Sequence, residues 1–188
     1  VPLTDLDHSV LARARAELAP ALALLPEADV CDRMSDKLEA HRFFVEQGVA
    51  SPRSWAPADV PADARYPLLV KARVGFGSRG IYRAETPEQL DYHVRHTPFD
   101  SMVQQCLAGE EFSIDVFCDF ESTCLNAIPR TMIQSKGGES IKGASIKDWE
   151  LIEHARRVAE TVGIVGPANF QCFREPDRTL PVTDVNPR

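Results

Sequence analysis

A chain of 188 residues with 44% hydrophobic residues can bury one large core or two small adjoining ones, and its composition is that of a folded, soluble protein. The net charge of −7 argues against binding to the phosphate backbone of nucleic acids, because such binding normally requires a basic surface. No apolar run approaches the roughly 20 residues that a membrane-spanning helix needs. We therefore expect neither nucleic acid nor a membrane as a partner.

The cysteines argue against a disulfide framework or a zinc site. They are odd in number and scattered without C-x-x-C spacing: Cys31, Cys106, Cys118, Cys124 and Cys172. This usage favours buried thiols in a reducing compartment, and we expect a cytoplasmic protein. The chain opens with Val1 rather than Met, so the lack of a visible signal peptide carries little weight. We expect a fragment of a longer enzyme.

The first predicted elements are helices. An apolar stripe predicts a helix over residues 3–25, bent or split at Pro20. A second helix is predicted to begin at a Ser35 or Asp36 cap and to end before Gly48, which takes the C′ position.

Strands and one helix follow in the predicted order. Strands are expected at residues 66–72 and 80–83, on either side of a glycine-rich loop. Thr86 is the predicted cap of a helix that ends near His96, because Pro87 and Glu88 form an acidic, proline-led first turn.

The second half is predicted to be rich in strands. These are expected at residues 102–106, 111–119, 123–128 and 131–134. Asp148 is then expected to cap a helix that ends at Gly163, with Trp149 on its buried side. A hairpin of residues 168–173 and 180–188 closes the chain, around a cluster of turn-forming residues.

We therefore expect an α+β protein in three parts. Residues 1–30 are interpreted as a remnant of a preceding domain or a linker helix. Residues 31–100 are expected to form a small subdomain with the glycine-rich flap, and residues 101–188 a larger, C-terminally incomplete one with the closing hairpin.

The segment Gly75–Gly80 matches the pattern G-x-G-x-x-G, but its context argues against a Rossmann site. That fingerprint leads from a strand into a helix, whereas Gly80 leads into a strand. A flap whose backbone N–H groups cover phosphates remains, and a flexible hairpin without a ligand is the alternative. Lys71 favours the flap, because a lysine in a buried strand needs an anionic partner or a route to solvent.

The closing hairpin places polar side chains on one face. Strand alternation puts Asp184, Asn186 and Arg188 together, opposite Val185, and Gln171 on the partner strand can lie beside them. One carboxylate and two amide oxygens suit Mg²⁺, which prefers oxygen ligands. A surface hairpin whose polar face meets solvent is the alternative, and the pattern alone leaves both open.

Between the two halves lies a short connector that can present backbone groups to an adenine edge. It follows Val103-Gln104-Gln105 and leads through Gly109 to Glu110 and Glu111. A carboxylate just beyond the connector can bind ribose hydroxyls, although two such glutamates are usually solvated turn residues.

Taken in order, these clusters resemble the ATP-grasp superfamily, in its branch like the large subunit of carbamoyl phosphate synthetase. The resemblance covers about residues 30–188. It is carried by Asp36-Lys37, Pro67-Leu68-Leu69-Val70-Lys71, Gly75–Gly80, Val103–Gln105 with Gly109–Ser113, and Gln171 with Asp184-Val185-Asn186-Pro187-Arg188.

The resemblance implies an ATP-grasp fold in which ATP lies between two α+β subdomains. Lys37 and Lys71 would contact the α- and β-phosphates. The loop would cover the β/γ end through Gly75, Gly77, Ser78 and Gly80.

The remaining site residues are also implied by the resemblance. Gln104, Gln105 and Leu107 would line the adenine, and Glu111 would hold the ribose. One or two Mg²⁺ ions, or Mn²⁺ as an alternative, would be bound by Gln171, Asp184 and Asn186. Positive charge for the transferred phosphoryl group or the acyl phosphate would come from Arg188, Arg130 and Lys142.

The implied activity is that of an ATP-dependent carboxylate–amine ligase. Its partners would be ATP, a small carboxylate, and an amine or other nucleophile that displaces phosphate from the acyl phosphate. A homodimer is left open. The alternative is a non-catalytic ATP-binding or regulatory module that has kept the fold without turnover.

Overall fold

Two four-stranded antiparallel sheets organise the protein, in a computed structural model that describes residues 5–75, 80–136 and 139–188. The small sheet contains, in spatial order, β1 (Ser54–Trp55), β4 (Ser101–Gln105), β2 (Leu68–Ala72) and β3 (Tyr82–Ala84). The large sheet contains, in spatial order, β10 (Val182–Pro187), β9 (Gly166–Arg174), β5 (Glu110–Cys118) and β6 (Cys124–Thr131). A further pair consists of β7 (Gln134–Lys136) and β8 (Glu139–Lys142).

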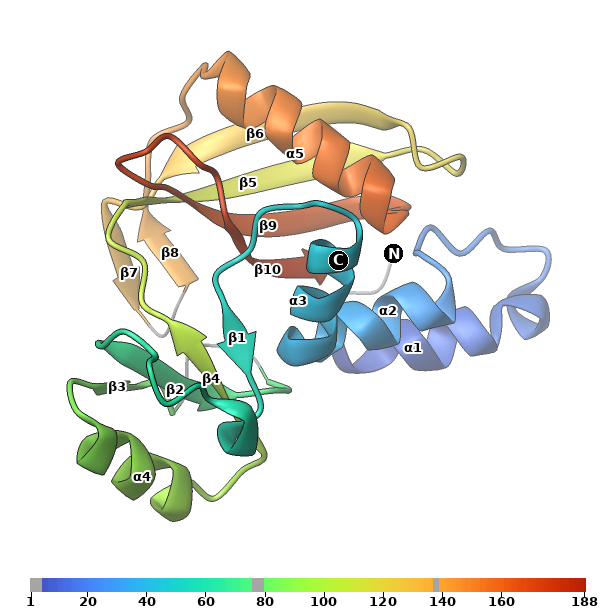
Figure 1. Ribbon diagram of the computed structural model, residues 1–188. Helices are drawn as coiled ribbons and strands as arrows, with labels where there is room; N and C mark the ends of the chain where they lie inside the picture. Colours follow the sequence, from blue (N-terminus) through green and yellow to red (C-terminus); the bar gives the residue numbers. More distant parts are fainter. Residues whose placement is uncertain (1–4, 76–79, 137–138) are drawn as a thin grey trace.

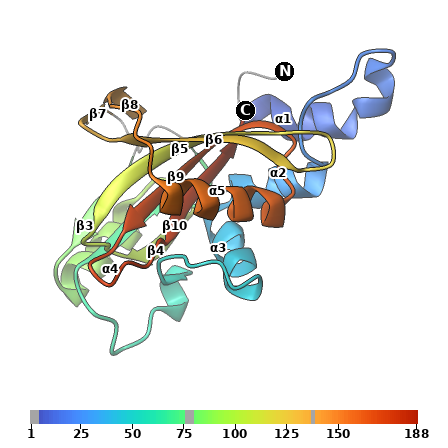
Figure 2. The same ribbon diagram turned by 90° about the horizontal axis from the view of Figure 1, so that it is seen from above.

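The helices divide between the two sheets. Figure 1 shows α5 (Trp149–Val162) lying across one face of the large sheet. The small sheet and α4 (Pro87–His96) lie below the large sheet in this view. Figure 2 shows the N-terminal helices beside one end of the large sheet and α4 toward the other. These N-terminal helices are α1 (Asp5–Arg13), α2 (Ala28–Ser35) and α3 (Lys37–Glu46).

The N-terminal region differs from the prediction of one helix reaching residue 25. Helix α1 ends at Arg13, and only a short 3-10 helix follows, over Arg15–Leu18. Proline lacks an N–H and disfavours helical geometry in the residue before it, which accounts for the end of the 3-10 helix at Leu18. No helix continues directly beyond Pro20 in this described part of the chain, as a bent or split helix would require. Helix α2 was not predicted from the sequence.

The predicted helix ends at Asp36, Gly48, Thr86 and Asp148 are confirmed. Asp36 accepts hydrogen bonds from the amides of Leu38 and Glu39, at 3.0 and 3.3 Å, and therefore caps α3. Ser35, the alternative cap, belongs to α2. Thr86 and Asp148 accept from the backbone of α4 and α5 in the same way, and Gly48 has a positive φ of 68°.

The prediction that Trp149 is buried is wrong. Its exposed fraction is 62%, and its ring instead lies 5.0 Å from the ammonium of Lys147. The buried stripe of α5 begins at Leu151. A step of two residues turns a helix by about 200°, so Trp149 faces away from the sheet.

The large core lies between α5 and one face of the large sheet. Alternation along β5 and β9 buries Phe112, Ile114 and Phe170 against Leu151 and other residues of α5. Phe44 of α3 belongs to the same core. The opposite face of the sheet carries polar side chains such as Ser113 and Asp115, together with the exposed Phe117 and Ile128.

The small core holds the small sheet against α4. Its buried members are Leu68, Val70, Ala84, Leu90 and Val103. Residues 69 and 71 of β2 alternate with 68 and 70, and they lie on the face away from this core.

The strand pairing differs from the subdomain boundary expected at residue 100. Strand β4 pairs with β2 along its whole length, from Leu68 opposite Gln105 to Ala72 opposite Ser101. Helix α3, expected in the small subdomain, contributes Ala40 and Phe44 to the large core. Contacts between distant segments place both elements, and local patterns do not contain that information.

The third strand of the second half is longer than predicted. Strand β6 continues to Thr131, opposite Phe112, because its pairing with β5 is maintained to that point. The strand expected at 131–134 is replaced by β7, which begins at Gln134. Within the described ranges, no helix is long and apolar enough to cross a membrane.

Candidate functional site

Lys71 is a buried amine that faces the space between the two sheets. It lies on the side of β2 away from the small core, opposite Met102 of β4, and only 8% of its surface is exposed. Burial lowers the pKa of Lys71 to about 8, while nearby Asp184 raises it and Lys37 lowers it. The predicted lysine in a buried strand is therefore confirmed, and the carboxylate of Asp184 on the large sheet acts electrostatically on its ammonium.

Lys37 joins three separate segments at the N-terminus of α3. Its ammonium donates a hydrogen bond of 2.7 Å to the carbonyl oxygen of Gly75, where the glycine-rich loop begins. The same ammonium lies 3.9 Å from the carboxylate of Asp184 on β10. Its backbone N–H donates to the carbonyl of Arg73, at the end of β2. Lys37, Lys71 and Asp184 thus converge from α3, β2 and β10.

The predicted metal-binding hairpin has the expected faces. Val185 is buried, while Asp184 and Asn186 are half-buried on the other side of β10. Gln171 of β9 lies directly opposite Asp184 in the strand register. A register irregularity between Val182 and Asp184 accompanies this arrangement.

The polar face continues across β5 and β6, which sequence reasoning missed. Ser113 lies opposite Gln171, and Asp115 lies opposite Asn169, which in turn is opposite Asn186. The Asn169 amide donates to Ser113 at 2.9 Å and to Asp115 at 2.7 Å. The predicted Arg130 donates to the same two residues, at 3.3 and 3.1 Å.

A signal for this larger face exists in the sequence. The alternation Glu111, Ser113, Asp115 along β5 continues the pattern that identified the hairpin, and Asn169 lies two residues before Gln171. Only the register of β5 against β9 shows that the two patterns share one face.

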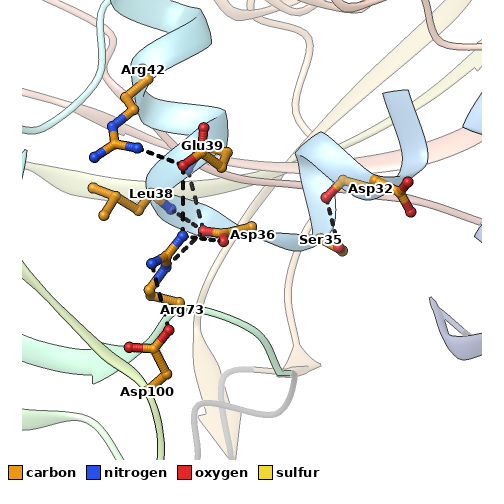
Figure 3. Close-up of polar contacts among 8 residues, drawn as sticks. All are labelled: Asp32, Ser35, Asp36, Leu38, Glu39, Arg42, Arg73 and Asp100. Atoms are coloured by element: carbon orange, nitrogen blue, oxygen red, sulfur yellow. Dashed lines mark hydrogen bonds and ion pairs between the residues drawn. The ribbon is translucent and has the colours of Figure 1, made fainter. Parts of the chain in front are cut away.

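Asp36 and Arg73 form a strut between α3 and the end of β2 (Figure 3). The Arg73 guanidinium donates to Asp36 at 2.5 Å and lies 3.6 Å from Glu39 and 3.5 Å from Asp100. Burial raises the pKa of Asp36, but hydrogen bonds from Arg73 and from the α3 backbone outweigh it, so the pKa is lowered overall. This strut holds the starts of α3 and of the glycine-rich loop together.

The glycine-rich loop is described only at its ends. Gly75 and Gly80 have positive φ values of 136° and 71°, which favour glycine. A Cβ at Gly80 would also overlap the ring of Phe99. The predicted contacts of Gly77 and Ser78 lie outside the described residues.

The predicted adenine contacts divide between two faces of β4. Gln104 is 4% exposed and donates to the hydroxyl of Ser54 at 2.9 Å, on the same face as Lys71. Gln105 is exposed and lies opposite Leu68, so alternation places its side chain on the other face. The structure therefore does not bring the Gln105 side chain together with Lys71.

Beyond β4, two predicted nucleotide contacts follow along the chain. Leu107 is half-buried in the connector. Glu111, at the start of β5, is also half-buried, and burial raises its pKa.

Arg188 and Lys142 differ in their relation to the cluster. Arg188 follows β10, and its backbone N–H donates to Pro167 at 2.8 Å, which continues the hairpin. Lys142 is exposed at the end of β8. Among the described residues, no contact joins Lys142 to Lys37, Lys71 or Asp184.

The donors at the hairpin suit Mg²⁺ only in company with a phosphate-bearing ligand. Across the described parts of the chain, no three His, Cys, Asp or Glu residues are grouped closely enough to hold a metal. Asp184 supplies one carboxylate, and Gln171 and Asn186 supply neutral amide oxygens. Mg²⁺ in nucleotide sites is often held by one or two carboxylates, with phosphates and water as the other ligands. The residues fit such a shared site.

A comparison of the sequence with family models identifies one family. The model of the ATP-grasp domain matches residues 34–188. The arginine-specific large chain of carbamoyl phosphate synthase from Halalkalibacterium halodurans is 30% identical over 139 residues, which cover 65% of this chain. The matched region spans 13% of that protein's length.

Solved structures share the fold at low sequence identity. An L-amino acid ligase from Bacillus licheniformis matches with a TM-score of 0.75 and 20% identity, over 100% of this chain and 48% of that one. The biotin carboxylase domain dimer of Hydrogenobacter thermophilus 2-oxoglutarate carboxylase, in complex with MgADP, ADP and bicarbonate, matches with a TM-score of 0.76 and 18% identity. That match covers 97% of this chain and 46% of the other. Since the family model spans well over half of the chain and the α+β fold agrees, the protein belongs to the ATP-grasp family.

Proposed function

We propose that this chain is the nucleotide-binding unit of an ATP-dependent carboxylate–amine ligase. Mg²⁺-ATP would phosphorylate a small carboxylate, and an amine or other nucleophile would displace phosphate from the acyl phosphate to form a C–N bond. The observation that carries the proposal is the convergence of Lys37, Lys71 and Asp184 from three separate elements.

The chemistry of phosphoryl transfer suits this cluster. Such transfer depends on positioning and on positive charge more than on covalent catalysis. Lys71 is buried and carries its charge at a cost, since its pKa is lowered to about 8. A polyphosphate beside it would stabilise the protonated form and raise that pKa, so the site favours an anionic ligand over none.

Each part of the cleft has a proposed role. Lys37 and Lys71 bind the α- and β-phosphates, and the loop that begins at Gly75 covers the β/γ end. The connector and the buried face of β4 receive the adenine through Leu107 and Gln104, and Glu111 holds the ribose.

The polar face of the large sheet receives the reacting end. Gln171, Asp184 and Asn186 would hold Mg²⁺, which when bound neutralises phosphate charge. Arg188 and Arg130 orient the transferred group by direct ionic contact.

Two of the compared proteins support a carboxylate substrate. One is an L-amino acid ligase, and the other structure contains MgADP together with bicarbonate, a small anion with a carboxylate-like group. The chain spans 13–48% of the length of the synthase chain and the two solved structures it resembles. The acceptor and the nucleophile are therefore proposed by chemical class.

A second candidate is an ATP-binding module without turnover. It is favoured by the single carboxylate among the proposed metal ligands, because a weakly held metal can bind nucleotide without supporting transfer. The two candidates differ in phosphate release and agree in nucleotide binding.

The test measures Mg²⁺-ATP binding by calorimetry and phosphate release over a panel of amino acids and other carboxylates. Asp184→Asn is compared with Asp63→Asn, which alters an exposed aspartate in the turn before β2. A ligase shows carboxylate-dependent release that Asp184→Asn abolishes and Asp63→Asn keeps. Binding without release under any carboxylate supports the second candidate, and absence of ATP binding overturns both.

A further inference from the structure

Glu175, in the loop between β9 and β10, binds the backbone of the connector that follows β4. Its carboxylate oxygen Oε1 accepts hydrogen bonds from the backbone amides of Ala108, at 3.1 Å, and Gly109, at 2.8 Å. Its other oxygen lies 3.5 Å from the Ala108 amide. Hydrogen bonds from two amides to one carboxylate are charge-assisted and stronger than bonds between neutral groups.

A second contact holds the connector against the same loop. A Cβ at Gly109 would overlap the backbone carbonyl oxygen of Arg174, so only glycine allows this approach. Pairing of β5 with β9 begins at the next residue, where Glu110 lies opposite Arg174. The connector is therefore in close backbone contact with the end of β9.

The loop that carries Glu175 is itself closed by local hydrogen bonds. The Glu175 N–H donates to the carbonyl of Thr179 at 3.0 Å, and the Arg178 N–H donates to the carbonyl of Glu175 at 2.8 Å. Asp177 accepts from both the amide and the hydroxyl of Thr179, at 3.0 and 2.7 Å. These hydrogen bonds within the loop hold the Glu175 backbone in position independently of its side-chain contact with the connector.

The hydrogen bond from the Ala108 amide to Glu175 bears on the direction of the Leu107 carbonyl group. That carbonyl also accepts a hydrogen bond from the Cys106 thiol at 3.8 Å. In a trans peptide the N–H and the preceding C=O point in opposite directions. Because the Ala108 N–H points at Glu175, the carbonyl oxygen of Leu107 points away from the loop. A carbonyl acceptor can pair with the 6-amino group of adenine, whereas guanine presents an acceptor oxygen at that position.

We propose that Glu175 is a positioning residue that orients the Leu107 carbonyl for adenine and so sets the preference for adenine over guanine nucleotides. The inference rests on the proposed binding of ATP in this cleft. It adds a residue outside the predicted site, on the same hairpin that carries Gln171 and Asp184.

The test compares Glu175→Ala and Glu175→Gln with Glu121→Ala, which alters an exposed glutamate in the turn between β5 and β6. Affinities are measured for Mg²⁺-ATP, Mg²⁺-GTP and inorganic tripolyphosphate, which lacks a base. Hydrogen exchange at the amides of Ala108 and Gly109 directly measures how well their hydrogen bonds to Glu175 protect them.

Glu175→Ala is expected to weaken ATP binding about tenfold, to leave tripolyphosphate binding unchanged, and to lower the ATP-to-GTP preference. Glu175→Gln keeps an acceptor oxygen and is expected to lose about threefold. Exchange at both amides should become faster in Glu175→Ala and stay unchanged in Glu121→Ala.

Two results would overturn the inference. Equal losses for ATP and tripolyphosphate would show that Glu175 acts on the whole fold, and unchanged nucleotide preference would show that it does not orient the base. If the unaltered chain binds no ATP, the proposed function fails and this role fails with it. Faster amide exchange in Glu175→Ala would in that case still show that Glu175 binds the two connector amides.

Discussion

At the scale of single residues, Lys71 is a charged side chain whose burial lowers its pKa. Its side chain is nearly inaccessible, yet it lies near one carboxylate, Asp184, and near a second cation, Lys37. A lysine in such surroundings loses its proton more readily than an exposed one. Its charge at neutral pH is therefore sensitive to what binds beside it.

The affinity for Mg²⁺-ATP should fall as the pH rises through about 8, where free Lys71 loses its proton. Below that pH the ammonium is present and attracts phosphate. Above it, binding must also take up a proton, which lowers the apparent affinity by up to about tenfold per pH unit. Calorimetry between pH 6.5 and 9.5 measures this slope.

Lys71→Arg is the matched control, because arginine stays protonated over this range. Its absolute affinity should be lower, since the guanidinium has a different shape, but its pH profile should be flat. An unaltered chain with the same flat profile as Lys71→Arg would contradict the role of Lys71.

His154 on α5 is a second buried titratable residue, outside the proposed site. Its exposed fraction is 8%, and its Nε2 atom has no hydrogen-bond partner among the described residues. Burial and the neighbouring Arg157 lower the pKa of His154 to about 4, against the smaller opposing effects of Leu180 and Glu150.

This histidine should make stability fall in acid. Its pKa is lower in the folded than in the unfolded chain, so its contribution is complete above pH 6.5 and is lost as the pH falls toward 4. Between pH 7 and pH 4.5 the unaltered chain should lose about 2 kcal/mol more unfolding free energy than His154→Leu. Urea denaturation at the two pH values measures the difference, and equal losses would contradict it.

At the scale of elements, α3 and β2 meet through one carboxylate with two tasks. Asp36 caps α3 through two backbone amides and also binds Arg73 at the end of β2. The proposed phosphate-binding residues Lys37 and Lys71 flank this junction. Its geometry therefore bears on stability and on the site together.

The two tasks of Asp36 can be separated by substitution. Asp36→Asn keeps a capping oxygen and loses the ion pair, whereas Asp36→Ala loses both. Asp36→Ala should therefore be less stable than Asp36→Asn by about 1 kcal/mol in urea denaturation. Equal stability of the two variants would mean that the cap contributes nothing measurable. Asp59→Asn, at an exposed aspartate, serves as the surface control.

At the scale of the whole molecule, polar contacts link the elements around the proposed cleft. They include the Asp36–Arg73 strut, the bond from Lys37 to Gly75, and the hydrogen bonds from the connector amides to Glu175. A ligand that contacts both sheets should stabilise the folded chain as a whole.

Mg²⁺-ATP at 100 times its dissociation constant should raise the unfolding free energy by about 2.7 kcal/mol. Mg²⁺ alone should have little effect, because the proposed metal ligands include one carboxylate only. Addition of EDTA to the ATP-bound chain should reverse much of the gain. Thermal or urea denaturation measures all three conditions, and a similar gain from Mg²⁺ alone would contradict a metal site shared with the nucleotide.

The local features of this fold follow from interactions between residues that are neighbours in the chain. The caps at Asp36, Thr86 and Asp148 depend on neighbouring residues, and the face of the closing hairpin depends on an alternation of period two. The order of the motifs also identified the family. The prediction of a helix that reaches residue 25, bent or split at Pro20, was wrong, because α1 ends at Arg13 and the following 3-10 helix at Leu18.

The meeting of residues that are distant in the chain depends on the packing of whole elements. Lys37, Lys71 and Asp184 converge because α3 packs into the large core while β2 pairs with β4 in the small sheet. The register of β5 against β9 adds Asp115 and Asn169 to the polar face, and the loop after β9 brings Glu175 to the connector. Packing between segments far apart in the chain determines these contacts, and no periodicity within one segment carries that information.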